Sequence, residues 1–182
     1  RQEAVPVMTP EALGEALEPY RAWMQGRLQL ETLSIATLPG ALESFREAVR
    51  LAPRDALARV GLASALQMQF EVTRAAGRPD PALRDDAVRA AREAVTLDSS
   101  SGEAWAALSF ALVSAGEISE AAAAARRAVA LEPGNWRHQF RLAHASWAEE
   151  RLRAGHRALE LLPDFAFAYS LAAMVHIARR AM

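Results

Sequence analysis

The sequence predicts an all-α protein, a solenoid of antiparallel helix pairs with about four units and a terminal half-unit. Three observations support this fold class. Apolar residues recur at the three- and four-residue spacing of amphipathic helices, and no window shows the sustained alternation of a β-strand. A short helix-ending pattern returns several times along the 182 residues. A second apolar helix pattern begins after each ending, as stacked helical hairpins require.

The repeated ending is a helix-forming stretch with a central alanine and, in three of its four copies, a terminal proline. Proline ends a helix because its ring removes a backbone donor and clashes with the preceding turn. Each copy therefore marks the end of the second helix of a pair. The copies occupy residues 45–53, 91–99, 125–133 and 155–163. Their central alanines, 46, 34 and 30 residues apart, are Ala48, Ala94, Ala128 and Ala158.

Capping residues and prolines set the helix boundaries in the first half of the chain. Thr9 and Asp80 occupy N-cap positions, and each precedes a proline, which is favoured at the first helical position because its missing N–H has no partner there anyway. Pro19 breaks or kinks the first helix. We expect helices over residues 10–20, 21–36, 40–51, 55–76 and 81–97.

The second half of the chain follows the same pattern at a shorter period. Asn135 is an N-cap residue, and the last helix is apolar on nearly every side. The end of a finished array is normally polar, so this helix predicts a continuation of the array, a homo-oligomer or a groove filled by the helix itself, and the first two are favoured. We expect helices over residues 102–115, 119–131, 135–148, 151–162 and 165–180.

These boundaries predict two parts. Residues 1–20 form an N-terminal segment with a short helix, and residues 21–182 form the repeat domain. Alanines at the closest approach of paired helices (Ala41, Ala87 and Ala121) allow each hairpin to close. The predicted units are 22–55, 56–101 with an insertion, 102–135, 136–165 and a half-unit over 166–182.

Composition excludes several classes of function. The net charge is −1, so long-range attraction favours neither nucleic acid nor an anionic membrane as a partner. No apolar run reaches the roughly 18 residues of a membrane span. All 21 basic residues are arginine and cysteine is absent, which removes lysine chemistry, thiolate metal sites and cysteine nucleophiles. The chain starts without a methionine or a signal peptide, which indicates a segment of a longer protein, with the cytoplasm as the favoured compartment.

Residues 102–133 carry a residue-level resemblance. Trp105 is followed by Leu108, and then by Leu112, Gly116, Ala121, Ala128, Leu131 and Pro133. This pattern resembles the tetratricopeptide repeat family, with a leucine at 112 where tyrosine is usual and an alanine at 125 where a large aromatic is usual. The unit over 56–101 has about a dozen extra residues. The unit over 136–165 is about four residues short, and has Arg151 and Gly155 where an alanine and an aromatic are expected.

The resemblance implies a right-handed superhelix and a non-catalytic scaffold that binds a partner peptide or domain on its concave face. The chain also looks like arrays attached to bacterial signalling and regulatory proteins, which implies a larger bacterial parent. In this family the first helix of each pair lines the groove, and its best-known carboxylate clamp uses lysine and asparagine at positions where this chain has neither. Arg137 and Arg141 remain able to pair one acidic side chain. Carried over by register, the candidate partner-binding residues are Leu57, Val60, Phe110, Arg137, Phe140, Arg141, His144, Trp147 and Met174.

No arrangement of residues predicts chemistry. The four histidines lack a metal-binding spacing, and no nucleophile, base and orienting group can be assembled, so we expect no enzyme activity, cofactor or metal. Two alternatives to a peptide scaffold remain. One is a sensor or regulatory segment that controls an attached effector domain, which predicts a deep closed pocket near His144 and Trp147. The other is self-association through the apolar C-terminal helix.

Overall fold

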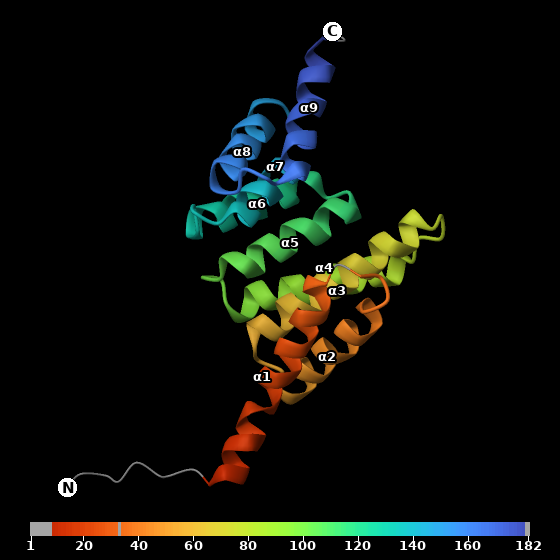
Figure 1. Cartoon of the computed structure of the whole chain (residues 1–182), viewed down its shortest axis with the longest axis vertical. Helices are drawn as coiled ribbons and strands as arrows, with labels where there is room; N and C mark the ends of the chain where they lie inside the picture. The colour runs from red at the N-terminus through yellow and green to blue at the C-terminus, as the bar shows by residue number, and fades with distance from the viewer. Residues whose placement is uncertain (1–8, 33, 181–182) are drawn as a thin grey trace, which may run out of the picture.

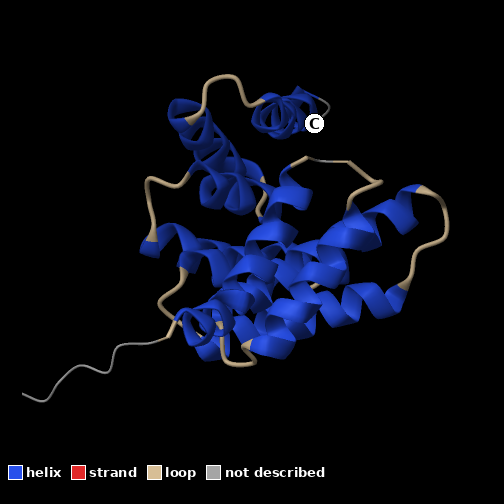
Figure 2. Ribbon diagram, turned by 60° about the horizontal axis from the view of Figure 1, so that its bottom comes forward, coloured by secondary structure: helices blue, strands red, loops and turns tan. Residues whose placement is uncertain are grey.

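The structure is a computed structural model that describes residues 9–32 and 34–180, and within those ranges every regular element is a helix (Figures 1 and 2). The first eight residues of the predicted N-terminal segment lie outside this description. None of the described helices is long and apolar enough to cross a membrane. The helices are α1 (Pro10–Glu31), α2 (Leu38–Leu51), α3 (Ala56–Ala75), α4 (Pro81–Leu97), α5 (Gly102–Ala115), α6 (Ile118–Leu131), α7 (Trp136–Ala145), α8 (Ala148–Leu161) and α9 (Ala166–Arg180).

The helices form two layers of a solenoid. Each odd-numbered helix packs on the following even-numbered helix as a hairpin, and it also contacts the next odd-numbered helix. The backbones of the described even-numbered helices do not approach one another as closely, and these helices are joined through side-chain ion pairs such as Arg92–Glu120 and Arg126–Glu150. The odd-numbered layer is therefore the tighter, inner layer, and it carries the concave surface. Figure 1 shows α1 at one end of the solenoid and α9, which has no paired second helix, at the other.

The hairpins close around small residues, as predicted. Ala41, Ala87 and Ala121 are completely buried. Phe45 of α2 is the largest of the fully buried side chains, and it packs between two glycines of the inner layer. A Cβ atom added at Gly26 of α1 would lie 2.9 Å from the Phe45 ring, and one added at Gly61 of α3 would lie closer still. These glycines make the slot that admits the ring.

The N-terminal helix differs from the prediction. The sequence predicted two helices, 10–20 and 21–36, with a break or a kink at Pro19, whereas the structure has one helix that continues through Pro19 and ends at Glu31. Proline removes one backbone N–H from the helix interior. On the exposed first half of α1 water can satisfy the freed carbonyl, and the second half is held by packing on α2.

Helix α7 is the shortest in the solenoid, with 10 residues against 14 in α5. The predicted helices 135–148 and 151–162 were wrong at their inner ends, because α7 stops at Ala145 and α8 begins at Ala148. Arg151, which replaces the alanine of the helix crossing, reaches across the end of α7. Its Nε donates to the carbonyl oxygens of Ala143 at 3.0 Å and Ser146 at 2.9 Å. The large side chain of Arg151 therefore occupies the space left by the missing turn of α7.

The turn that joins α7 to α8 is strained at Ala148. This residue has a φ of 50°, the sole positive φ of a non-glycine residue among those described. The left-handed conformation costs an L-residue roughly 1–2 kcal/mol. We expect Ala148→Gly to raise the free energy of unfolding by about 0.5–1 kcal/mol in urea denaturation. Ala123→Gly, on the exposed side of α6 where φ is helical, should lower it by about the same amount.

Candidate partner-binding groove

The inner layer forms a cleft of about 330 Å³ between α1, α3, α5 and α7. Leu57 and Val60 of α3 line it, as predicted from the register of the repeats. Trp23 and Leu30 of α1 form the opposite wall, and the Phe45 ring lies at its base beside Gly61. Arg27 and Glu31 pair at 3.0 Å on the rim. This end of the inner layer offers an apolar cavity with charged edges.

A smaller pocket of about 60 Å³ adjoins the cleft, and the two share Val60, Ser64, Glu103 and Arg137 as lining residues. Phe110 of α5 and Arg141 of α7 complete the small pocket. We call the cleft and this pocket together the groove. Its wall changes from apolar side chains at α1 and α3 to two arginines at α7.

Arg141 is the central charged residue of the groove. Its guanidinium carbon lies 3.6 Å from the centre of the Phe110 ring and 5.8 Å from that of Phe140. Burial lowers the pKa of Arg141 to about 10, with the charge of Glu103 opposing this shift and that of Arg137 adding to it. The group remains charged near neutral pH. No hydrogen bond or ion pair involves its guanidinium within the described part of the chain. Stacking on the two rings and the charge of Glu103 are the interactions that act on it.

An aromatic cluster continues the wall from α7 to α9. The Phe165 ring lies edge-on to Trp136 at 4.6 Å and to Phe140 at 4.8 Å between centroids. The guanidinium of Arg137 lies 4.7 Å from the centre of the Trp136 ring. Phe140 is therefore packed within the wall, where it contacts Arg141 without lining the groove itself.

His144 and Trp147 line a different cleft, between the first turns of α6 and α8, with Ile118 as a neighbour. Trp147 is 57% exposed, and the guanidinium of Arg151 lies 4.5 Å from the centre of its ring. Burial lowers the pKa of His144, and the charges of Arg141 and Arg151 lower it further. This cleft is open to solvent. It is not the deep closed pocket that the sensor alternative predicts near these two residues.

The nine candidate residues thus separate into groups. The structure brings five of them together in the groove: Leu57, Val60, Phe110, Arg137 and Arg141. Phe140 and His144 contact that group from behind, with the His144 ring 6.0 Å from Phe110. Trp147 lies at the α7–α8 turn, and Met174 is exposed on α9. Sequence reasoning missed Trp23 and Leu30, although extending the same register to the first helix of the array would have found them.

A histidine–carboxylate cluster lies beside the groove and was also missed. Ligand atoms of Glu103, Glu132 and His138 lie within 4.8 Å of one another. Glu132 Oε2 accepts a hydrogen bond from Asn135 Nδ2 at 3.0 Å and lies 3.1 Å from His138 Nε2. The hydrogen bond from Asn135 is the main cause that lowers the pKa of Glu132, and the backbone N–H of Gly102 contributes.

The orientation of the Asn135 side-chain amide determines whether this cluster can bind a metal ion. Its Oδ1 accepts the backbone N–H of Arg137 at 3.0 Å as the N-cap of α7, so its NH₂ group must face Glu132 and His138. A donor group in that position occupies the space where a metal ion would bind. A Cβ atom at Gly102 would lie 2.5 Å from Glu132 Oε1, so the glycine admits the carboxylate to the start of α5. We interpret the cluster as a hydrogen-bonded link that joins α6 to α5 and α7, and we call it the Glu132 clasp.

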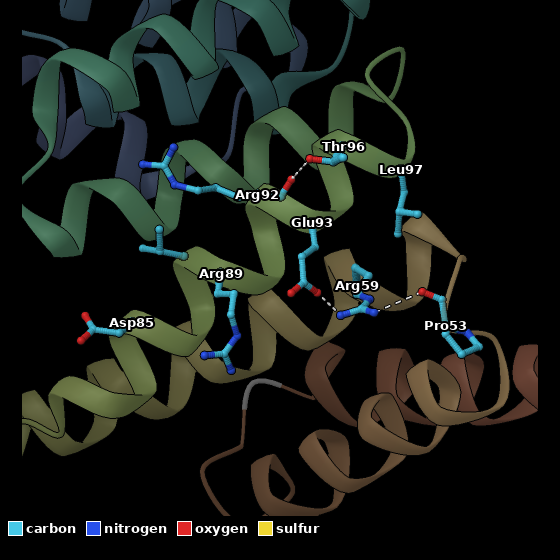
Figure 3. Close-up of a pocket in the computed structure, with 9 residues that line it drawn as sticks. Pro53, Arg59, Asp85, Arg89, Arg92, Glu93, Thr96 and Leu97 are labelled. Atoms are coloured by element: carbon cyan, nitrogen blue, oxygen red, sulfur yellow. Dashed lines mark hydrogen bonds and ion pairs between the residues drawn. The ribbon is translucent and has the colours of Figure 1, made fainter.

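The cleft shown in Figure 3, of about 500 Å³, lies on the outer side of α3 and α4. Three arginines line it, and each has an acidic partner. Arg59 pairs with Glu93, Arg89 pairs with Asp86, and Arg92 pairs with both Glu117 and Glu120. Its positive charges are therefore neutralised locally, unlike those of Arg137 and Arg141.

Comparison with known proteins identifies the fold. The sequence pattern of the tetratricopeptide repeat family matches residues 102–145. The TPR protein TTC0263 of Thermus thermophilus is similar over 92% of this chain and 86% of its own, with a TM-score of 0.70 and 20% identity. The pilF protein of Pseudomonas aeruginosa has a TM-score of 0.68 and 20% identity, over 92% of this chain and 72% of its own.

A third solved structure contains a bound peptide. The second TPR domain of human RPAP3, in complex with an HSP70 peptide, has a TM-score of 0.53 and 18% identity, over 71% of this chain and 99% of its own. No curated protein matches the chain in sequence. At these identities the solved structures establish the fold of the chain.

Proposed function

The chain has the fold of a tetratricopeptide-repeat array, and from this premise we propose that it is a non-catalytic scaffold that binds a peptide segment of a partner protein in the groove. One observation carries the proposal. Arg141 lies in the groove wall with its guanidinium stacked on Phe110, and it makes no ion pair within the described chain, although the charge of Glu103 in the same pocket favours its charged form. A desolvated cation with free donors is a strong binding site for a carboxylate.

The two parts of the groove suit different parts of one peptide. The cleft lined by Trp23, Leu57 and Val60 suits an apolar side chain, and the small pocket beside Arg137 and Arg141 suits a carboxylate. Aromatic and arginine side chains are also the residues that most often dominate binding energy at protein interfaces. We therefore propose a partner segment with an apolar residue and, a few residues away, an acidic one.

Selection from a random-peptide display library tests this function. We expect the selected peptides to share an acidic residue, and we expect Arg141→Gln to weaken their binding about tenfold or more, since a hydrogen bond to a charged group contributes about 1.5–3 kcal/mol. Fluorescence anisotropy with a labelled selected peptide measures the effect. Binding should also weaken with added salt.

Arg127→Gln is the matched control, because Arg127 is exposed on α6 in the outer layer. It should leave the affinity unchanged. If Arg127→Gln and Arg141→Gln reduce binding equally, the arginine acts through net charge alone and the groove assignment fails. Selected peptides that bind the double variant Leu57→Gln/Arg141→Gln as tightly as the unchanged protein would equally contradict it.

A further inference from the structure

The small pocket of the groove contains two opposite charges that do not pair with each other. Arg141 lines it from α7, and Glu103 lines it from the first turn of α5. The charge of Glu103 favours the charged form of Arg141, which shows that the two groups interact across the pocket. Neither side chain makes a hydrogen bond or an ion pair with any other described residue. The pocket therefore has a cationic side and an anionic side, each with free hydrogen-bonding atoms.

Like charges lie beside each of these two groups. Arg137 also lines the pocket, and its charge opposes that of Arg141. On the other side, a carboxylate oxygen of Glu103 lies within 4.8 Å of one of Glu132. The hydrogen bonds of the Glu132 clasp satisfy Glu132 but leave Glu103 without a donor. A ligand with one anionic and one cationic group would relieve the repulsion on both sides.

The polar pocket opens into the apolar cleft of the groove. The two share Val60, Ser64, Glu103 and Arg137 as lining residues. The cleft measures about 330 Å³, and Trp23 is among its apolar walls. Sites for small molecules typically have volumes of roughly 300–1,000 Å³, apolar walls and a few convergent polar groups. The groove combines these features at one place.

We propose that the groove binds a free α-amino acid with a large apolar side chain. Its carboxylate accepts hydrogen bonds from Arg141, with the charge of Arg137 nearby, and its ammonium group donates to Glu103. Its side chain enters the cleft against Trp23 and Leu57. An α-amino acid has both charged groups and the side chain on one carbon, as a divided polar pocket beside an apolar cleft requires. The ligand would compete with a groove-bound peptide for Arg141, but its binding does not depend on the proposed peptide function.

Isothermal titration calorimetry with L-leucine, L-methionine and L-phenylalanine tests the proposal. We expect saturable 1:1 binding of at least one of them. For the amino acid that binds most tightly, the N-acetyl derivative lacks the ammonium group and the amide lacks the carboxylate. Each should bind at least tenfold more weakly, because a buried polar group of the site then loses its partner. Glycine, which has no side chain for the cleft, should also bind at least tenfold more weakly.

Variants assign each group of the ligand to its residue. Glu103→Gln should weaken binding of the amino acid at least tenfold and leave the affinity for its N-acetyl derivative unchanged, since that derivative has no ammonium group. Arg141→Gln should weaken both ligands. Glu15→Gln is the matched control, because Glu15 is exposed on α1, and it should change neither affinity. Circular dichroism checks that the variants remain folded.

Three results would overturn the inference. The first is that none of the three amino acids binds. The second is an N-acetyl derivative that binds as tightly as the free amino acid, which rejects the ammonium site and leaves Arg141 as the carboxylate site of the proposed function. The third is binding that neither Glu103→Gln nor Arg141→Gln reduces, which places the amino acid outside the small pocket. Display-selected peptides that bind when the amino acids do not would reject this inference alone.

Discussion

Phe45→Ala is expected to lower the free energy of unfolding by about 3–5 kcal/mol, because it removes a fully buried ring and leaves a cavity that the backbone cannot close. Gly26 and Gly61 contact the ring, and neither has a side chain that could move in to fill the space. Urea denaturation followed by circular dichroism measures the change. The ring is also the base of the groove, so the cleft should widen and the affinity for any groove-bound peptide should fall as well.

Two glycine-to-alanine substitutions test the same packing by adding a methyl group instead of removing the ring. Gly61→Ala places a methyl group against the Phe45 ring, and overpacking of this kind costs about 1–3 kcal/mol. Gly14→Ala on the exposed part of α1 meets no atom, so it should stabilise the protein by about 0.5–1 kcal/mol. Opposite signs for the two substitutions are expected. A stabilising Gly61→Ala would show that the slot around Phe45 is not rigid.

Arg151→Ala is expected to lower the free energy of unfolding by about 2–3 kcal/mol, since it removes charged hydrogen bonds from carbonyl groups at the end of α7. The family pattern alone would predict no loss of stability from this substitution, because alanine is the usual residue at that position. The alanine suits a first helix of full length, whereas here the arginine occupies the place of the missing turn.

Arg153→Ala is the matched control on the same helix. Arg153 is exposed, so its change should stay within about 0.5 kcal/mol. Chemical denaturation of both variants gives the comparison. If Arg151→Ala is as stable as Arg153→Ala, the arginine does not cap α7, and the short helix is stabilised by its packing on α5 and α6 alone.

The sequence predicted the residues at the centre of the candidate groove better than the residues at its two ends. The register of the repeat placed Val60, Phe110 and Arg141 correctly on the inner layer, because a constant helical period keeps the same positions on the same face. The register could not predict the position of Trp147. Helix α7 is one turn short and ends at Ala145, so Trp147 lies in the turn before α8 and not on the groove side of α7. Whether the five clustered residues bind a partner stays a prediction.

Local signals in the sequence determined the class of the fold. Helical periodicity, caps such as Asp80 and Asn135, terminal prolines and buried crossing alanines each act over a few residues and agree with one another. Tertiary structure alone decided the continuous α1, the Arg151 cap, the Glu132 clasp and the unpaired Arg141 on Phe110. The stacking of Arg141 on Phe110 joins residues of two different hairpins. The contacts of Arg151 and Glu132 span only a few residues, but they too are set by how neighbouring helices pack and by which polar groups burial leaves to be satisfied.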